Sequence, residues 1–343
     1  MLVERDMAEL KDLERQLLDP ETWPAETEAR KALIERFCVG YVVPPLANFL
    51  PTAYRARLNT GPDLFGHVRE LLAPPPAMVK RPGRLNHAGA STLYLSGQPI
   101  SAIFETRAEI GSTVSILACR LRPDAPELQV APVAMTKLGT TASLGPLSDL
   151  MAQGPLGYAP FAEALMQRGL RDQWLLQDQA LGNLLVLDPG GEKQEKLYDL
   201  TNGIRDHLYR GYDGYEGVHY PSVVVRMTAP NLALDARRWE DIEPIEVWVT
   251  EVVPEMAWQG YSRTLCLSKP VIKIGLVEKD GSISYASSDR SFLGVWSDFK
   301  QKYGPLNRAP RASLSPTLQR PFRRMRMSYG YEPGRRSLDF MIT

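Results

Sequence analysis

An α+β fold is predicted for this chain of 343 residues. Strand patterns, the strongest of them at 113–121, alternate irregularly with helical patterns and do not form repeating βαβ units. The chain shows no internal repeat and no long low-complexity segment. Its composition, 44% hydrophobic and 23% charged, is typical of a soluble globular protein with a sizeable core.

The first 45 residues predict an N-terminal helical arm. Leu10, Leu13 and Leu17 recur at helical spacing within an expected helix over 3–18, and a second helix is expected over 26–38. No chemistry is visible in this arm. A cap packed on the main domain is therefore the preferred interpretation, with a dimerisation or partner arm as the alternative.

A main domain is expected over 46–236, followed by a C-terminal extension over 237–343 with a basic tail. In the main domain we expect strands at 54–57, 91–96, 113–121, 183–187 and 218–227 and helices at 63–72, 99–105, 160–168 and 198–209. In the extension we expect strands at 245–252 and 263–277, a hairpin turn at Asp280-Gly281, and a helix through Lys302 that Ser288 or Asp289 caps.

Charge and cysteine content restrict the classes of function. Lys plus Arg equals Asp plus Glu at 40 each, so no global field steers nucleic acid to the chain. The ends differ: residues 1–30 carry a net −5 (four bases, nine acids) and 300–343 a net +8 (ten bases, two acids), which indicates mutual docking or a partner-facing tail. The three cysteines, Cys38, Cys119 and Cys266, form no metal or disulfide pattern.

The expected location is the cytoplasm, without a membrane partner. An odd number of scattered cysteines is simplest to explain in a reducing compartment. The charged N-terminus lacks an apolar signal core, and no apolar run approaches the ~20 residues that span a bilayer.

Several catalytic signatures are absent from the sequence. There is no GxxxxGK[ST], no GxGxxG after a strand and no GxSxG, and the four histidines lack HExxH-like spacing. A histidine-based triad or a zinc site is therefore not expected, and no metal is assigned.

The most informative stretch is Gly83–Glu105, GRLNHAGASTLYLSGQPISAIFE. Arg84 offers a rigid donor fork for phosphate, and Tyr94 offers a flat face for a nucleobase or nicotinamide ring. Glu105 could bind a ribose hydroxyl or stabilise an oxocarbenium ion. Together they suit cleavage of a ribosyl bond in a nucleotide. Judged by residue types alone, a surface Arg–Glu pair and a core tyrosine are the better explanation.

The order of the motifs along the chain favours a nucleotide site over this structural explanation. The pattern GR-L-N-x-x-G-x-x-x-L-Y-L-S, then A-I-x-E, then a distant Y-P-S followed by N-L-A-L, resembles the RES-domain family over roughly 54–234. The resemblance implies an ADP-ribosyltransferase-like fold, a split α+β core that clamps NAD between two small sheets. It also implies NAD as substrate. Family members are NAD-degrading toxins that hydrolyse or phosphorolyse the nicotinamide–ribose bond, and some ADP-ribosylate a protein. Many are paired with a helix-turn-helix antitoxin.

The resemblance also assigns roles to individual residues. Arg84 and, less directly, Arg55 would bind the pyrophosphate, and Tyr94 would stack on nicotinamide. Glu105 would hold the nicotinamide-side ribose and stabilise its cationic transition state, and Ser222 would bond the ribose or Glu105. Asn86 is counted with the NAD-binding residues. Together with Gly89, it belongs to the turn that sets Arg84.

Three functions stay open at this point. The first is an NAD glycohydrolase or phosphorylase acting as a toxin of a toxin–antitoxin system. The second is an ADP-ribosyltransferase with a macromolecular or small acceptor, because the chain is much longer than the usual toxins of the family. The third is a non-catalytic NAD-binding or nucleic-acid-binding protein, with the arginine-rich RPFRRMR at 320–326 contacting the partner.

Overall fold

The structure is a computed structural model, and it describes residues 4–43, 45–47, 52–61, 63–126, 128–134, 165–212, 214–222, 230–252 and 270–303. It confirms a mixed α+β chain. The described residues fall into two compact units. The helical unit takes those within 4–46 and 131–215, and the sheet unit takes those within 47–130 and 216–303.

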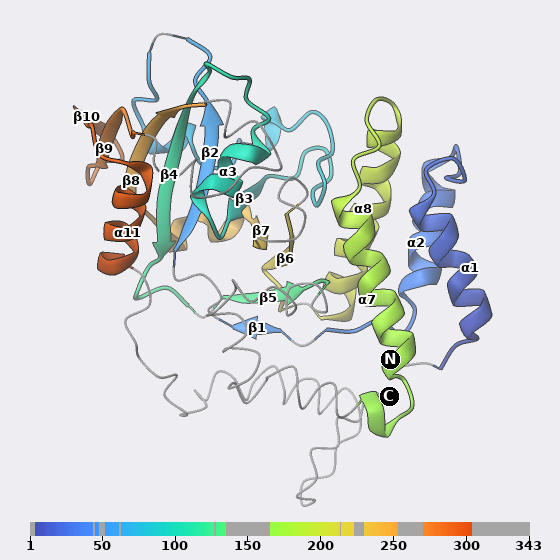
Figure 1. Ribbon diagram of the computed structural model, residues 1–343. Coiled ribbons are helices and arrows are strands. Elements are labelled where there is room, and N and C mark those ends of the chain that lie inside the picture. Colours follow the sequence, from blue (N-terminus) through green and yellow to red (C-terminus); the bar gives the residue numbers. More distant parts are fainter. Residues whose placement is uncertain are drawn as a thin grey trace, which may run out of the picture. The chain divides into compact units, whose positions relative to one another are not determined.

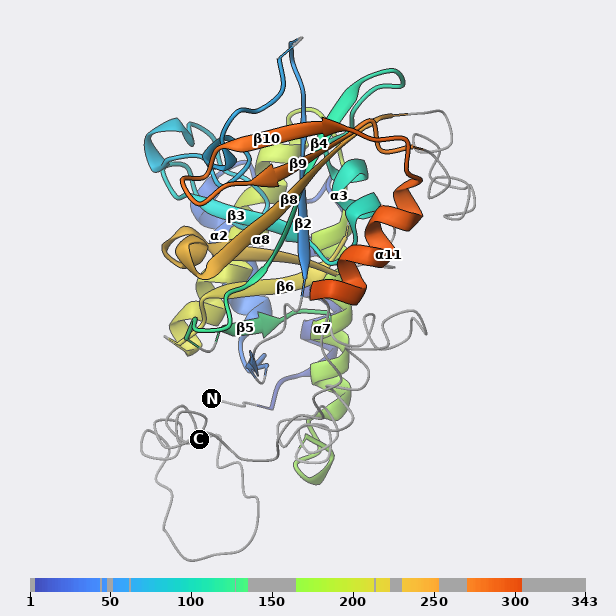
Figure 2. The ribbon, with the colours of Figure 1, turned by 90° about the vertical axis from the view of Figure 1, so that its left-hand side faces the viewer.

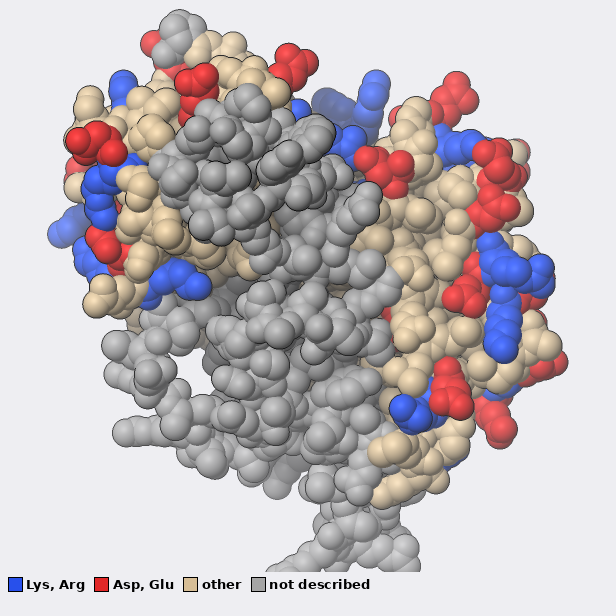
Figure 3. Space-filling view, in the orientation of Figure 1, with Lys and Arg blue, Asp and Glu red and all other residues tan. Residues whose placement is uncertain are grey.

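The helical unit contains four helices among its described residues: α1 (Met7–Leu18), α2 (Thr27–Cys38), α7 (Arg171–Val186) and α8 (Lys193–Gly211). Asp6 caps α1 by accepting from the Ala8 amide at 2.8 Å. The apolar face of α1 is buried as predicted, and α1 packs on α2 and α7, and α8 on α2 and α7. Basic and acidic side chains are interspersed over these helices on the right of Figure 3.

Ten strands among the described residues form one sheet in the order β1-β5-β6-β7-β3-β2-β4-β8-β9-β10, and every described pairing is antiparallel. Figure 1 shows their course. Their bounds are β1 Leu46–Ala47, β2 Ala53–Leu58, β3 Thr92–Ser96, β4 Thr113–Leu121, β5 Gln129–Pro132, β6 Gly217–Pro221, β7 Pro230–Asp235, β8 Ile242–Glu251, β9 Lys273–Val277 and β10 Ile283–Ser287.

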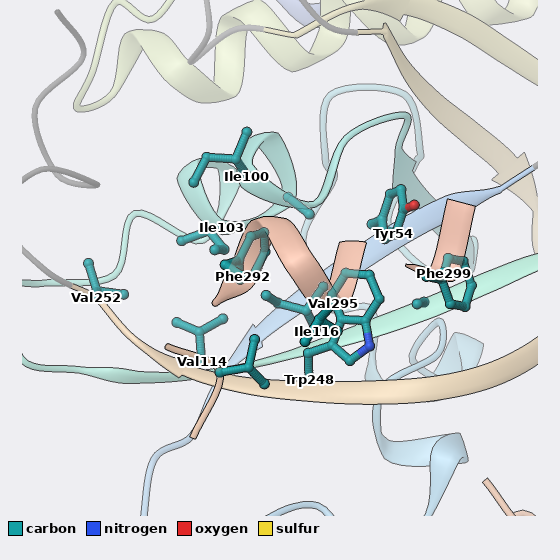
Figure 4. Close-up of a cluster of buried hydrophobic side chains, with 13 residues drawn as sticks. Tyr54, Ile100, Ile103, Val114, Ile116, Trp248, Val252, Phe292, Val295 and Phe299 are labelled. Atoms are coloured by element: carbon teal, nitrogen blue, oxygen red, sulfur yellow. The ribbon is translucent and has the colours of Figure 1, made fainter. Parts of the chain in front are cut away.

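Two helices, α3 (Pro99–Glu105) and α11 (Phe292–Tyr303), cover the same face of the sheet formed by β2, β4 and β8 (Figure 2). The core between them is centred on Trp248, whose ring meets those of Phe292 and Phe299 edge-on at 5.9 and 5.4 Å (Figure 4). Ile100 and Ile103 bury α3 against this core. Since Glu105 is the last residue of α3, the core fixes the place from which its carboxylate emerges.

The sheet is split between β2 and β3. These neighbours share one described residue pair, Tyr54 with Ser96, whereas β2 pairs with β4 over six residues and β3 with β7 over five. Two sub-sheets, one around β7 and one around β4, are therefore joined at a single point. Carbonyl groups along the split need partners other than a neighbouring strand.

Several predicted elements are confirmed in type, and others are wrong. The strand expected at 183–187 is the end of helix α7, because Leu181, Leu184 and Leu185 are buried at helical spacing, and a short apolar run does not distinguish the two states. The helix expected at 63–72 is only a 3₁₀ turn, η1 (Val68–Glu70), capped by His67 and not by Asp63.

Two boundaries of the last helix also differ. Ser291, and not Ser288 or Asp289, accepts from the Gly294 amide at 3.1 Å, and α11 runs one residue past Lys302. The hairpin turn at Asp280-Gly281 is confirmed, because β9 and β10 pair on either side of it. Two short 3₁₀ helices, η2 (Pro76–Met78) and η3 (Ala236–Asp241), complete the described elements.

Some predictions concern residues outside the described ranges. These are most of the helix at 160–168, the ends of the strands at 218–227 and 263–277, Cys266 and the basic tail with RPFRRMR. Within the described ranges, none of the helices combines the length and apolarity that crossing a bilayer requires.

Candidate functional site

The site is built on one row of side chains that crosses four strands of the sheet unit. Register pairs run from Tyr54 to Ser96, from Ser96 to Asn231 and from Asn231 to Tyr220. Residues opposite one another in antiparallel strands project to the same face, so this row lies on the face that α3 covers. Ser222 follows Tyr220 by two residues, the spacing that keeps a side chain on the same face.

Glu105 ends α3 above this row and is exposed, whereas the two residues that bond it are buried. The Ser222 hydroxyl donates to Glu105 Oε1 at 2.6 Å, and the Asn231 side-chain amide donates to the same oxygen at 2.8 Å. Ser222 is 0% and Asn231 4% exposed. Among the described residues no donor is bonded to Oε2. The carboxylate is thus held through Oε1, and Oε2 is available to a ligand.

Tyr220 connects this carboxylate to the rest of the site. Burial raises the pKa of Tyr220 well above its usual value, and the charges of Tyr94 and Glu105 raise it further. The charge of Arg84 and a hydrogen bond with Asn231 act in the opposite direction. Its hydroxyl therefore stays protonated at neutral pH, within electrostatic reach of all four groups.

Arg84 lies in a tight turn whose geometry depends on Tyr94. The Gly83 amide donates to the Asn86 carbonyl at 2.9 Å and closes the turn. The Tyr94 hydroxyl donates to Asn86 Oδ1 at 2.8 Å and accepts from the Leu85 amide at 2.9 Å. A Cβ at Gly83 would lie 2.3 Å from Asn86 Oδ1, so only glycine permits this approach. The GR-L-N motif and the tyrosine are one structural unit.

Arg55 lies at the split between the sub-sheets. Its Nη1 donates to the Tyr94 carbonyl at 2.9 Å, which supplies a partner that β2 does not. Its Nε is buried and has no hydrogen-bond partner among the described residues. Burial lowers the pKa of Arg55 to about 10, and the nearby charge of Arg57 lowers it further, while Tyr94 and Tyr220 oppose this shift. Within the described part of the chain no carboxylate pairs with this half-buried guanidinium.

The structure brings most of the predicted residues together. Glu105 and Ser222 are bonded directly, and Asn86 is bonded to Tyr94. Asn86 is buried inside the turn, and its contribution to ligand binding stays a prediction. His219 is buried in β6, and His87 adjoins the turn. Three or more metal-ligating side chains do not cluster anywhere in the described residues.

Two residues of the site have roles that their motifs do not predict. Asn231 is the first letter of the N-L-A-L motif, and Tyr220 the first of Y-P-S, but the motifs predict neither the bond from Asn231 to Glu105 nor the electrostatic effect of Glu105 on Tyr220. Their place within the two motifs was the one signal available, because the sequence does not show which strands pair. The register of β6 with β7, and that of β7 with β3, determine which side chains lie together beneath α3.

Comparison of the chain with protein-family models, with curated proteins and with solved structures found no match in any of the three. The site is therefore interpreted from its own geometry and from the motifs in the sequence.

Proposed function

We propose that this chain consumes NAD by breaking the bond between nicotinamide and its ribose. The observation that carries the proposal is the Glu105 carboxylate, exposed, held through Oε1 by two buried donors and open at Oε2. A fixed carboxylate of this kind suits stabilisation of a cation that develops at a sugar carbon.

In the proposed reaction the bond between ribose C1′ and the nicotinamide nitrogen breaks, and nicotinamide leaves with the electron pair. Positive charge develops on the ribose as an oxocarbenium-like transition state, which the negative charge of Glu105 stabilises. Water then attacks C1′ and loses a proton to give ADP-ribose, or phosphate attacks to give its 1-phosphate. Because nicotinamide carries a positive charge in NAD, it leaves neutral without needing a general acid.

The pyrophosphate fits the arginines of the site. Arg55 is a half-buried guanidinium with no carboxylate partner in the described residues and with an unbonded Nε. A desolvated charge without a partner is costly, and an anionic ligand would offset that cost. Arg84 is held by the turn nearby, with its charge acting on Tyr220. In this proposal the Tyr94 hydroxyl serves the turn, which leaves its ring to stack on nicotinamide.

The split between β2 and β3 also supports the ADP-ribosyltransferase-like architecture, as does the placement of the motif residues around it. An NAD-degrading toxin with a helix-turn-helix antitoxin is the role we propose within that architecture. Wild-type expression should lower cellular NAD and arrest bacterial growth, and Glu105→Gln should do neither.

Nicotinamide release from NAD by the purified full chain tests the activity. We expect turnover by the wild type and a loss of at least about 100-fold in Glu105→Gln, since one preorganised electrostatic group contributes that much. Glu109→Gln, an exposed glutamate just beyond the same helix, is the matched control and should be fully active. Equal rates in wild type and Glu105→Gln would remove Glu105 from the mechanism, and no nicotinamide release would reject the function.

The fate of ADP-ribose decides between the acceptors. Free ADP-ribose without added phosphate indicates hydrolysis, and a phosphate-dependent rate with a 1-phosphate product indicates phosphorolysis. Labelled NAD that leaves its label on a protein, a nucleic acid or a small molecule would identify the chain as an ADP-ribosyltransferase. Binding of NAD without turnover would instead support the non-catalytic alternative.

A further inference from the structure

Glu105 depends on a residue to which the sequence motifs assign no role. Asn231, the second residue of β7, donates to Glu105 Oε1 at 2.8 Å from a side chain that is 4% exposed. We propose that Asn231 is a positioning residue, which orients the carboxylate so that Oε2 faces the substrate. The proposal rests on the proposed function, because that function supplies the reacting atom at which Glu105 is aimed.

Asn231 is itself held on three sides. Its backbone lies between β6 and β3, with Tyr220 and Ser96 as its direct register partners. Its side chain is also hydrogen-bonded with Tyr220. A donor fixed by two strands and a buried tyrosine can fix its acceptor in turn, whereas an exposed glutamate at the end of a helix would otherwise sample several rotamers.

Stability of the fold does not account for an asparagine here. Its Oδ1 is buried and has no hydrogen-bond partner among the described residues. Burying an unbonded carbonyl costs free energy, and a leucine of similar size would fill the space without that cost. The amide nitrogen explains the asparagine, because it donates to Glu105 and an apolar residue could not make that contact.

The absence of charge on the Asn231 amide also suits a positioning residue. A lysine at this position would neutralise the carboxylate that the reaction needs. The Asn231 amide and the Ser222 hydroxyl are neutral, so they orient Glu105 and leave its negative charge for the transition state. The other titratable or charged groups gathered around Tyr220 are Tyr94, Arg84 and Arg55.

The substitution Asn231→Asp, which replaces the side-chain amide by a carboxyl group, tests the positioning role. In Asn231→Asp two carboxylates face each other at neutral pH and the donor is lost. At lower pH the pair shares one proton, which restores a donor to Glu105. We therefore expect kcat for nicotinamide release to fall at least tenfold at pH 8, with KM little changed, and to recover relative to wild type toward pH 5. Asn231→Leu should lose activity at both pH values.

A second readout needs no turnover. The like-charge pair in Asn231→Asp raises the pair's folded-state pKa, so the associated stability is present at low pH and lost as pH rises through that value. The denaturant midpoint should thus be lower at pH 8 than at pH 5, relative to wild type. Adding Glu105→Gln should recover it, because the glutamine amide then donates to the new carboxylate. This double variant should stay inactive. Asn202→Asp, at a buried asparagine of α8, is the control and should gain nothing from Glu105→Gln.

The outcomes separate this role from the proposed function. A wild type that releases nicotinamide, with an Asn231→Asp variant whose relative rate is the same at pH 5 and pH 8, would overturn the positioning role alone. A double variant no more stable than the two single changes predict would overturn the contact. A wild type without NAD turnover would overturn the proposed function, and the positioning role with it, whatever the stability measurements show.

Discussion

The Ser222 hydroxyl donates to Oε1 of Glu105 at 2.6 Å, although 117 residues separate the two in the chain. Asn231 bonds the same oxygen across 126 residues. Three distant segments, the end of α3, the residue after β6 and the start of β7, thus converge on one carboxylate. The convergence follows from strand register, which places Tyr220, Asn231 and Ser96 in one row beneath α3.

Removing the Ser222 hydroxyl should slow the reaction. In Ser222→Ala, Oε1 keeps only the Asn231 donor, and a hydrogen bond to a charged group contributes about 1.5–3 kcal/mol. We expect kcat for nicotinamide release to fall by roughly 10- to 100-fold, with a small effect on KM. Ser115→Ala is the matched control, since Ser115 is buried in β4 and donates to Asn59 Oδ1 at 2.9 Å. Similar rates for both variants would contradict a specific role for Ser222.

Adding one methyl group at Gly83 should disrupt the turn that carries Arg84. In Gly83→Ala the new Cβ would lie 2.3 Å from Asn86 Oδ1, so the turn must shift and the bond from Tyr94 must weaken. The expected loss of unfolding free energy is about 1–3 kcal/mol by chemical denaturation. The affinity for NAD should fall as well. Gly66→Ala introduces its methyl group into open space, and its stability should match wild type.

Anions should stabilise the wild type through Arg55. Pyrophosphate or ADP-ribose should raise its melting temperature, because a ligand at 100 times its Kd contributes about 2.7 kcal/mol. In Arg55→Met the shift should disappear, since the substitution removes a guanidinium that no carboxylate of the described residues neutralises. Arg120→Met is the control. Arg120 lies in β4 of the same sheet and is already paired with Glu243 at 2.6 Å, so its loss should leave the shift intact. An undiminished shift in Arg55→Met would place the anion elsewhere.

Acid should destabilise the fold through His219. Burial lowers the pKa of His219 to about 3, whereas an unfolded histidine titrates near 6.5. The unfolded chain therefore binds a proton that the folded chain does not, and stability is lost as pH falls from about 6.5 toward 3, by at most about 1.4 kcal/mol per pH unit. His219→Leu should flatten the dependence of unfolding free energy on pH in that window. Parallel curves for the two proteins would refute this origin.

Much of the secondary structure could be predicted from local patterns. The leucines of α1 recur at helical spacing, and β4 is a run rich in branched residues. The local pattern therefore identifies α1 as a helix and β4 as a strand. The strand or helix state of the run at 183–187 could not be predicted, because four consecutive apolar residues after Asn183 suit a buried strand or the end of a buried helix equally well. Whether such a run forms a strand or a helix depends on the residues that surround it in the tertiary structure.

The sequence by itself determined which residues to examine and in what order they occur: Arg84, Tyr94, Glu105 and Ser222 stand in ordered motifs. Only the tertiary structure decided how they act on one another. It placed Tyr94 in the turn of Arg84, set Arg55 at the split with no carboxylate partner among the described residues, and brought Asn231 to Glu105. The physical reason is that these contacts depend on which strands pair and in which register, and a shift of one residue would turn the strand residues Tyr94, Arg55 and Asn231 to the opposite face.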